Sequence, residues 1–494
     1  MQLLRDDDDG FFPAHSNEEH FHHRYRDNNF VDVPHFYSPT AKEEPPPSRS
    51  GDMISVTLFG QPVVILNSLQ LAFDTLDKKS LIYSSRPSLV MGGQIVGWDQ
   101  TVALRPYGKQ LREHRRLLSQ FIGSHKNVEQ FVPLIEVQTS LSLFDILHKP
   151  DDVAEHVRRT AGAIILMMSH GYQVQNIHDP ILELVERATT QVSQVVSPGA
   201  FLVDTFPLLR YVPAWMPGAG WKKKAAFWKQ TLQDMINVPH NYVMGQMAAG
   251  TAIPNFTSIN LEKDSSPESE VLIKSTAASL YSGGADTTVS AVMSLFLAMT
   301  CFPDIQKKAQ HEIDTVVGSD RLPVFADRER LPYINAICLE VLRWNPIATL
   351  GIPHCLSEDD VHDGYFLPKG TIVFANIWHF AHDPATYTNP MEFNPERFVP
   401  SSDKPAEQDP RTMVFGFGRR ICPGLNFADA SIFVSCAMIL AVFQISKVVE
   451  NGVVVEPTVK YTSSPISHPF PFKCFIQARS SKAAAPILSA HNRK

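Results

Sequence analysis

The decapeptide FGFGRRICPG, residues 415–424, limits what this chain can fold into more than any other stretch. It holds one cysteine among glycines and arginines, and it opens into the apolar stretch LNFADASIFVSCAMILAVF. That stretch predicts a helix, and Pro423 suits the first helical position, where a missing N–H group costs nothing. Cys422 is therefore expected at a helix N-terminus, beside unpaired backbone N–H groups and the positive end of the helix dipole.

The setting expected for Cys422 lowers the pKa of a thiol and stabilises the thiolate. A thiolate can act as a nucleophile, but a nucleophile normally needs a nearby base such as histidine, and the decapeptide contains none. A zinc site would need further Cys or His residues at short spacing, and none follows. A single isolated thiolate suits one axial bond to haem iron, because the porphyrin provides the other ligands.

The decapeptide is similar to the haem-binding signature of the cytochromes P-450, aromatic-Gly-x-Gly-x-Arg-x-Cys-x-Gly. Three further segments resemble family motifs in the family's order. They are YSGGADTTVSAV (281–292) for the long central helix, ICLEVLRWNP (337–346) for the Glu-x-x-Arg helix, and FNPERF (393–398) for a buried arginine. The segment at 212–225, VPAWMPGAGWKKKA, resembles a sequence found in fungal secondary-metabolism members of the family. Each motif is weak alone, but together they leave little room for chance.

The resemblance implies a mainly α-helical fold with small β-sheets, in one large haem-enclosing domain. MISVTLFGQPVVIL (53–66) fits this fold, since its alternation predicts two strands around a Gly-Gln-Pro turn. Three parts of the chain are expected. They are a polar, disordered segment at 1–52 without the family's usual membrane anchor, a catalytic domain at 53–478, and a loose C-terminal tail at 479–494.

The resemblance also assigns the residues that would hold the cofactor, haem b. Cys422 is the implied axial thiolate ligand, and Phe415 at the start of the signature is an implied haem contact. Arginine side chains suit the two haem propionates geometrically. The implied propionate partners are Arg420, His354 and Arg115. The family usually has tryptophan four residues before the last of these, and Leu111 stands there in this chain, so one hydrogen-bond donor is missing.

The central helix is expected to carry the catalytic residues. Gly283 and Gly284 each cost about 1 kcal/mol relative to alanine in a helix, which indicates a functional distortion that admits dioxygen and water. The resemblance assigns Thr287 a hydrogen bond to the activated dioxygen and Asp286 a role in relaying protons. The alternative is a threonine that bonds to the backbone of its own helix.

A second group of charged residues is expected to be structural. Glu340 and Arg343 of the Glu-x-x-Arg helix, together with Arg397 of FNPERF, resemble the buried ion cluster of the family. Such a cluster is costly to break by removing one member.

The resemblance implies a monooxygenase that activates dioxygen with electrons from NADPH–cytochrome P-450 reductase. The substrate would be hydroxylated or epoxidised in secondary metabolism. Segments expected to line the pocket are largely apolar, so an apolar small molecule such as a terpenoid, indole or polyketide is the expected substrate. Two alternatives stay open: a haem-thiolate isomerase or peroxygenase that needs no electron partner, and a non-functional truncated haem protein.

Charge and hydropathy bear on partners and location. A net charge of −7 argues against nucleic acid as a partner. Six cysteines in 494 residues predict reduced thiols in a cytosol-facing compartment. No stretch reaches the roughly 18 apolar residues of a membrane span, although the family associates with the endoplasmic reticulum membrane. The apolar residues of FLVDTFPLLRYVPAWMPGAGW (201–221) could still contact a bilayer surface.

Overall fold

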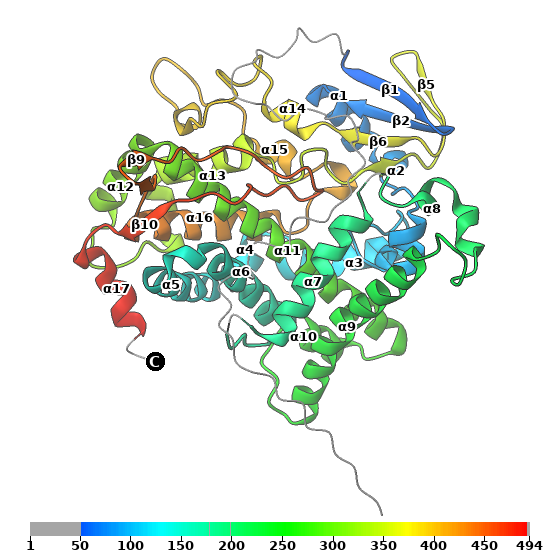
Figure 1. Cartoon of the computed structure of the whole chain (residues 1–494), viewed down its shortest axis with the longest axis horizontal. Coiled ribbons are helices and arrows are strands. Elements are labelled where there is room, and N and C mark those ends of the chain that lie inside the picture. The colour runs from blue at the N-terminus through cyan, green and yellow to red at the C-terminus, as the bar shows by residue number, and fades with distance from the viewer. Residues whose placement is uncertain (1–50, 177, 198, 492–494) are drawn as a thin grey trace, which may run out of the picture. The chain divides into compact units, whose positions relative to one another are not determined.

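The computed structural model describes residues 51–176, 178–197 and 199–491. Long helices make up most of this region, and a small sheet containing β1, β2 and β6 lies beside them (Figure 1). The predicted class, mainly α with small β-sheets, is therefore confirmed. The segment predicted to be disordered lies, up to residue 50, outside the described residues.

The largest sheet has the strand order β1-β2-β6-β3. Its strands are β1 (Met53–Leu58), β2 (Gln61–Leu66), β6 (Ile372–Ala375) and β3 (His354–Cys355). The predicted hairpin of β1 and β2 is confirmed, and its two turn residues, Phe59 and Gly60, both have positive φ. Strand β2 pairs in parallel with β6, whereas β3 pairs antiparallel with β6. Two-stranded sheets join β4 (Asp360–His362) to β5 (Tyr365–Leu367), β7 (Phe443–Ser446) to β10 (Phe475–Ala478), and β8 (Val449–Glu450) to β9 (Val453–Val454).

Long helices carry most of the core. They are α3 (Lys109–Ile122), α5 (Val132–His148), α6 (Val153–His170), α7 (Pro180–Val195), α9 (Trp221–Ala248), α11 (Pro267–Cys301), α12 (Pro303–Val316), α13 (Pro332–Trp344) and α16 (Leu425–Val442). Several begin with proline, which is pre-set for the first helical position.

Shorter helices connect these elements. The α-helices among them are α1 (Leu69–Ala72), α2 (Ser80–Tyr83), α4 (His125–Glu129), α8 (Leu202–Thr205), α10 (Phe256–Lys263), α14 (Ile377–Ala381), α15 (Arg411–Val414) and α17 (Ser481–His491). The 3-10 helices are η3 (Trp98–Gln100), η4 (Pro150–Asp152), η5 (Pro207–Tyr211), η6 (Phe325–Arg330), η7 (Pro395–Phe398) and η8 (Gly418–Arg420). The π-helices are η1 (Phe73–Lys78) and η2 (Val90–Val96).

Helix α11 runs through the centre of the helical region (Figure 1) and packs most extensively against α6. A close approach makes this possible, because a Cβ atom at Gly284 would lie only 2.8 Å from Cδ1 of Ile165. Helices α11 and α16 are long and apolar enough to cross a membrane by length and composition alone. Both are mostly buried inside the fold, which is typical of core helices.

Two hydrophobic clusters meet at the signature decapeptide. The larger cluster lies among the long helices and includes Phe427 at the start of α16. The smaller cluster lies between the largest sheet, α1 and α14, and includes Phe417. The Phe417 ring packs edge-on against Phe73 and Phe380. The decapeptide is therefore held between both clusters.

The C-terminal segment differs from its prediction. A loose tail was expected from residue 479, but α17 forms there and packs against α5. Ile487 is buried in that contact, and Arg479 forms an ion pair of 2.5 Å with Asp314. The prediction of a loose tail is wrong for residues 481–491, because apolar residues of that short segment find a partner surface.

Candidate functional site

The signature decapeptide forms a closed loop before α16. The backbone N–H of Cys422 donates to the carbonyl of Phe415 over 2.8 Å, which closes the loop. Helix α16 begins at Leu425 with Gly424 as its N-cap. The prediction that Pro423 occupies the first helical position is therefore wrong. Cys422 and Pro423 belong to the loop, since the backbone of Cys422 is bonded back to Phe415 instead of joining the helix.

Two glycines give this loop its shape. Gly416 has φ +78° and Gly418 has φ +51°, in the left-handed region that favours glycine. A Cβ atom at Gly418 would also lie 2.4 Å from the carbonyl oxygen of Leu76, which real structures do not tolerate. The loop therefore needs glycine at 418 for both conformation and space.

Opposing effects act on the pKa of the Cys422 thiol. Burial raises the pKa of Cys422, whereas a hydrogen bond from the Gly424 N–H group and the charge of Arg115 lower it. Burial has the largest effect, so the prediction of a lowered thiol pKa is wrong for the protein alone. Binding to a metal cation deprotonates a thiol, which makes so enclosed a sulfur suitable as a ligand.

Arg420 lies in the same region and is anchored to backbone. Its guanidinium donates to the carbonyls of Ser84 over 2.6 Å, Val102 over 3.2 Å and Arg105 over 2.6 Å. Burial and the charge of Arg115 lower the pKa of Arg420 to about 10. Arg115 and Arg420 are therefore close enough to repel each other.

Arg86 is a third arginine in this group, and the sequence analysis missed it. Burial and the charges of Arg420 and Arg115 hold its pKa well below the ordinary value. Its guanidinium donates only to backbone carbonyls, among them that of Ala103 over 2.9 Å. Arg86 lies in YSSRPSL, which matches none of the recognised motifs. The one signal that could have found it in the sequence is an arginine in a segment of mixed polarity.

His354, on strand β3, lies within the electrostatic influence of Arg86 and Arg420. Its Nδ1 lies 2.8 Å from the carbonyl oxygen of Tyr83, and this contact requires a proton on Nδ1. Burial and the charges of Arg86 and Arg420 hold the pKa of His354 well below its ordinary value. The imidazole alone is therefore neutral, with Nε2 as an acceptor.

The arginine cluster, defined as Arg86, Arg115 and Arg420, has no carboxylate partner among residues 51–491 that the structure describes. Buried positive charges without counter-ions are costly. A ligand that brings two carboxylates next to Cys422 would neutralise most of this charge. The two propionates and the iron of haem match these requirements, so the residues present fit this cofactor.

The predicted catalytic pair lies on α11. The Thr287 hydroxyl donates to the carbonyl of Gly283 over 2.9 Å, as Thr288 does to Gly284 over 2.8 Å. Helix α11 is unbroken from Pro267 to Cys301, so the distortion predicted at the two glycines does not interrupt it. The threonines bond to their own helix, as the alternative interpretation expected. A Cβ atom at Gly283 would meet no atom within 4 Å, so this face of the helix is open.

Asp286 contacts a histidine that lies in none of the recognised motifs. Its Oδ2 lies 3.1 Å from Nε2 of His468, a residue near the C-terminal end of the domain. Within the described residues, no hydrogen bond or ion pair joins Asp286 or Thr287 to the arginine cluster. The structure thus groups Cys422 with the arginines and His354, and it holds Asp286 and Thr287 in a second group on α11.

The predicted ion cluster is buried, as expected. Glu340 receives two hydrogen bonds of 2.7 Å from Arg343 and lies 3.2 Å from Arg397. Arg397 also pairs over 2.7 Å with Glu407, which the sequence analysis missed. The buried part of the cluster therefore contains two arginines and two carboxylates, and the exposed amine of Lys404 also reaches Glu407, over 2.7 Å.

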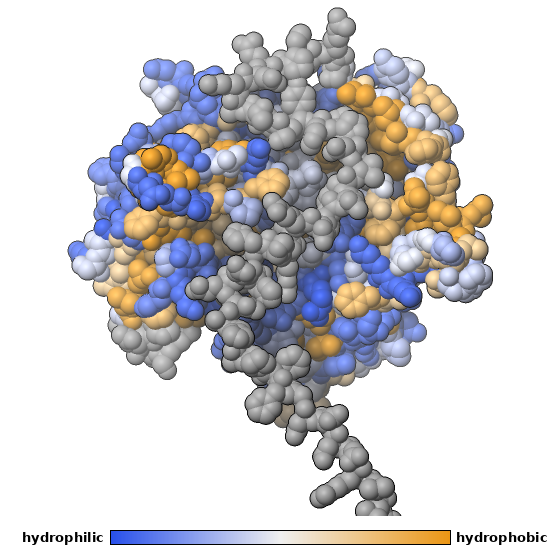
Figure 2. Space-filling view, viewed as in Figure 1, coloured by the Kyte–Doolittle hydropathy of each residue, from blue (hydrophilic) through white to orange (hydrophobic). Residues whose placement is uncertain are grey.

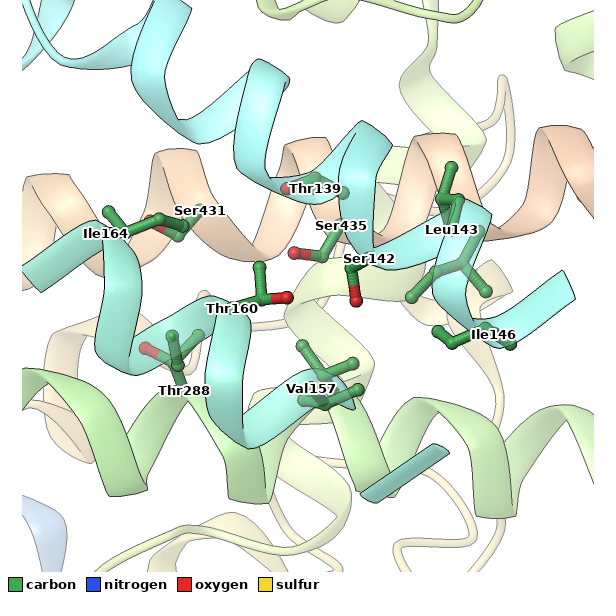
Figure 3. A pocket seen from close by; sticks show the side chains of 13 residues that line it. Thr139, Ser142, Leu143, Ile146, Val157, Thr160, Ile164, Thr288, Ser431 and Ser435 are labelled. Carbon is green, nitrogen blue, oxygen red and sulfur yellow. The ribbon is translucent and has the colours of Figure 1, made fainter. Parts of the chain in front are cut away.

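A small cavity lies among α5, α6, α11 and α16 (Figure 3). Its volume is about 30 Å³, and several hydroxyl groups line it. The hydroxyls of Thr139 and Ser431 are buried there without a hydrogen-bond partner. None of the predicted site residues lines this cavity, so it is separate from both groups described above.

Comparisons with known proteins fit this arrangement. The sequence profile of the cytochrome P-450 family matches residues 47–465. Cytochrome P-450 monooxygenase 208 of Postia placenta is 57% identical over 441 residues, covering 89% of this chain and 86% of that protein. Cytochrome P-450 monooxygenase claR of Ampulloclitocybe clavipes is 47% identical, covering 88% of this chain and 81% of that protein. The chain therefore belongs to the cytochrome P-450 family.

A solved structure supports the fold independently. A zebra fish cytochrome P-450 with abiraterone matches with a TM-score of 0.69 over 87% of this chain and 97% of that one. The sequences are 21% identical, so this match shows the fold alone. It confirms the cytochrome P-450 fold that the motifs predicted.

Proposed function

We propose that this chain is a haem-thiolate monooxygenase that oxidises an apolar small molecule with dioxygen and electrons from NADPH–cytochrome P-450 reductase. The observation that carries the proposal is the arginine cluster beside Cys422. Three arginines without carboxylate partners among the described residues, two of them buried and one half-buried, next to a half-buried thiol match one cofactor with two acidic groups and a metal. The curated relatives described above are fungal proteins named monooxygenases, which supports the reaction class. The proposed role in secondary metabolism rests on the resemblance of residues 212–225 to members with that role.

The roles of the residues follow from their geometry. Cys422 would bind the haem iron through sulfur, and the Gly424 N–H group would stabilise the thiolate. Arg86, Arg115 and Arg420 would hold the propionates, with His354 packed beside them. When bound, the haem supplies the chemistry that activates dioxygen.

Asp286 and Thr287 would deliver protons to that chemistry. The Thr287 hydroxyl, now bonded to Gly283, can rotate to donate a hydrogen bond toward the open face of α11. The Asp286 carboxylate would pass protons toward it, as a positioned acid–base group does. This pair favours a monooxygenase over an isomerase or a peroxygenase, because only the monooxygenase reaction consumes protons together with electrons from a reductase.

The substrate would be apolar. Leu350 and Ile352, in the segment after the Glu-x-x-Arg helix, are both 42% exposed although they are aliphatic. Exposed apolar side chains in a segment expected to line the pocket support an apolar ligand.

A peripheral contact with a membrane is part of this proposal. An apolar patch is formed by exposed side chains of α8, η5, the following loop and the β1–β2 turn, and a hydrophobic area lies over these elements at the right of Figure 2. Its members are Leu58, Phe59, Leu202, Phe206, Leu208, Tyr211, Trp215 and Met216. The rings of Phe59 and Phe206 join the two parts at 5.8 Å between centroids. Exposed aromatic and aliphatic side chains of this kind suit the surface of a bilayer.

The decisive experiment is the absorption spectrum of the purified protein, reduced and bound to carbon monoxide. We expect the red-shifted Soret band of thiolate-ligated haem, and its loss in Cys422→Ser. A Cys422→Ser protein that keeps this band would refute the ligand assignment. Product formation with and without reductase and NADPH then distinguishes the alternatives, since an isomerase, or a peroxygenase supplied with hydrogen peroxide, would turn over without reductase. A protein that binds no haem would support the non-functional alternative.

A further inference from the structure

We infer that His468 is a positioning residue for Asp286, so that the imidazole holds the carboxylate in the orientation needed for proton delivery. The inference deepens the proposed function and rests on the proposed role of Asp286. It starts from the 3.1 Å contact between Nε2 of His468 and Oδ2 of Asp286. Each side chain is 25% exposed, so the pair is more shielded from solvent than an ordinary surface ion pair.

His468 itself is held rigidly by its own loop. The backbone N–H of His468 donates to the Thr462 hydroxyl over 3.0 Å, and the backbone N–H of Thr462 donates to the His468 carbonyl over 2.8 Å. A β-bridge between Tyr461 and Pro469 closes the loop just outside these bonds. These two reciprocal hydrogen bonds fix the backbone of His468, which keeps its imidazole within reach of Asp286.

The same loop is fastened to α11 next to the ion pair. Ser290 lies one helical turn after Asp286, on the same face of α11, and its hydroxyl donates to the Ser467 carbonyl over 2.5 Å. The backbone N–H of Ser467 donates to the carbonyl of Ile347 over 2.7 Å. The position of His468 is therefore set by α11 and by the segment after the Glu-x-x-Arg helix.

Other charged groups near Asp286 make this pairing necessary. Burial raises the pKa of Glu186 on α7, and the negative charge of Asp286 raises it further. The positive charge of Arg158 on α6 lowers the pKa of Glu186 and so opposes both effects. The Tyr281 hydroxyl, five residues before Asp286 on α11, is buried without a hydrogen-bond partner. Within the described part of the chain, His468 is the group that pairs with Asp286, whereas Arg158 pairs with Glu186 over 3.8 Å.

Because the imidazole contacts the Asp286 carboxylate directly, its loss would leave the carboxylate free to rotate and facing the charge of Glu186. The helix and the haem site would be unaffected, since His468 contacts neither the arginine cluster nor Cys422. The expected result is a protein that binds haem normally but delivers protons poorly.

The test compares His468→Phe, which removes the donor, with His468→Gln, which keeps a neutral donor. Each haem-loaded variant is assayed with reductase and a substrate found by screening, and product and hydrogen peroxide are measured per NADPH consumed. We expect product per NADPH to fall about tenfold in His468→Phe, the loss of one hydrogen bond to a charged group, and to fall less in His468→Gln. The matched control is His178→Gln, which removes the exposed ion pair with Glu183 and should change nothing.

A second readout does not depend on activity. In protein labelled with ¹³C-histidine, the His468 resonance is identified by its absence from the NMR spectrum of His468→Gln. We expect that resonance to move in Asp286→Asn, whereas the resonance of His178 stays in place.

The outcomes separate this inference from the proposed function. A His468 resonance unmoved by Asp286→Asn, or normal coupling in His468→Phe while Asp286→Asn uncouples, would overturn the role of His468 alone. Normal coupling in Asp286→Asn would refute the proposed role of Asp286 and the inference that rests on it. In that case, a His468 resonance that moves in Asp286→Asn would show only that the two residues are in contact.

Discussion

The guanidinium of Arg343 forms two parallel hydrogen bonds of 2.7 Å with the carboxylate of Glu340, and neither side chain is exposed to solvent. The remaining guanidinium hydrogens of Arg343 reach backbone carbonyls, among them that of Ala381 over 2.8 Å. The pair therefore fixes α13 to the segment 381–392 that follows α14. A buried pair that satisfies all its donors holds chain segments together more than it adds net stability.

Removing one member of this pair should be severe. Glu340→Ala leaves Arg343 and Arg397 without their shared carboxylate, at a cost of about 3–5 kcal/mol in the free energy of unfolding. We expect low yield and low haem content. The control is Glu113→Ala, which breaks an exposed pair with Arg116 and should cost about 0–1 kcal/mol. Equal thermal stability of the two variants would contradict the argument.

Glu407, the second carboxylate of the ion cluster, should make the stability of the fold depend on pH. Burial alone would raise the pKa of Glu407, but hydrogen bonds from Lys404 and Arg397 outweigh it and lower the pKa to about 2. A folded-state pKa below the ordinary value near 4.5 stabilises the fold above that pH. This contribution should be lost as the pH falls from 4.5 toward 2.

The measurement is the midpoint of thermal unfolding across that pH range. Glu407→Gln should be less stable than the wild-type protein near neutral pH, and the difference should shrink toward pH 2. Parallel curves for the two proteins would show that Glu407 does not titrate as proposed. Glu113→Gln serves as the exposed control.

The arginine cluster predicts a defect in haem retention. Arg86→Met should speed haem loss, measured as transfer of haem to excess apomyoglobin, because one of three propionate-facing charges is removed. Arg112→Met is the matched control, since Arg112 is exposed on α3 three residues before Arg115. Haem transfer at the same rate in all three proteins would count against the assignment of Arg86.

If Thr287 helps to deliver protons, replacing it should change the reaction products but not haem binding. Thr287→Ala removes a hydroxyl bonded to Gly283 and leaves a better helix former. Haem content should stay normal, while dioxygen leaves increasingly as hydrogen peroxide. Loss of a proton donor typically costs about 10² to 10⁴ in the step that it serves. Thr288→Ala is the control, because Thr288 makes the same kind of backbone bond. Unchanged product per NADPH in Thr287→Ala would show that the proton takes another route.

The small cavity predicts a stabilising substitution. The Ser431 hydroxyl is buried without a partner, and such a group costs about 1–3 kcal/mol. Ser431→Ala should therefore raise the free energy of unfolding by about 1 kcal/mol. Ser290→Ala, which loses the bond to Ser467, should lower it. A loss of stability in Ser431→Ala would instead indicate that a water molecule bonds this hydroxyl inside the cavity.

The sequence allowed the fold class and the signature cysteine to be predicted, because these rest on local patterns and on the order of motifs. Arg86 and His468 could not be predicted, since each finds its partners in distant segments and lies in no motif. Glu407 lies only ten residues after Arg397, but it belongs to no motif, and no sequence pattern shows that the loop between them brings the two side chains together. The pKa of Cys422 was predicted in the wrong direction, because the argument from the helix N-terminus is local whereas burial depends on the whole fold.

The bond between Arg420 and the carbonyl of Ser84 joins residues 336 positions apart. A ribosome that adds about 5–20 residues per second needs roughly 20 to 70 seconds to make the chain between them. During that time Arg86 and Arg115 are already synthesised, while their neighbours Arg420 and Cys422 do not yet exist. Contacts this distant in sequence form late and slowly. The proposed haem site would therefore be complete only after the last quarter of the chain has been translated, and until then Arg86 and Arg115 lack their neighbours Arg420 and Cys422.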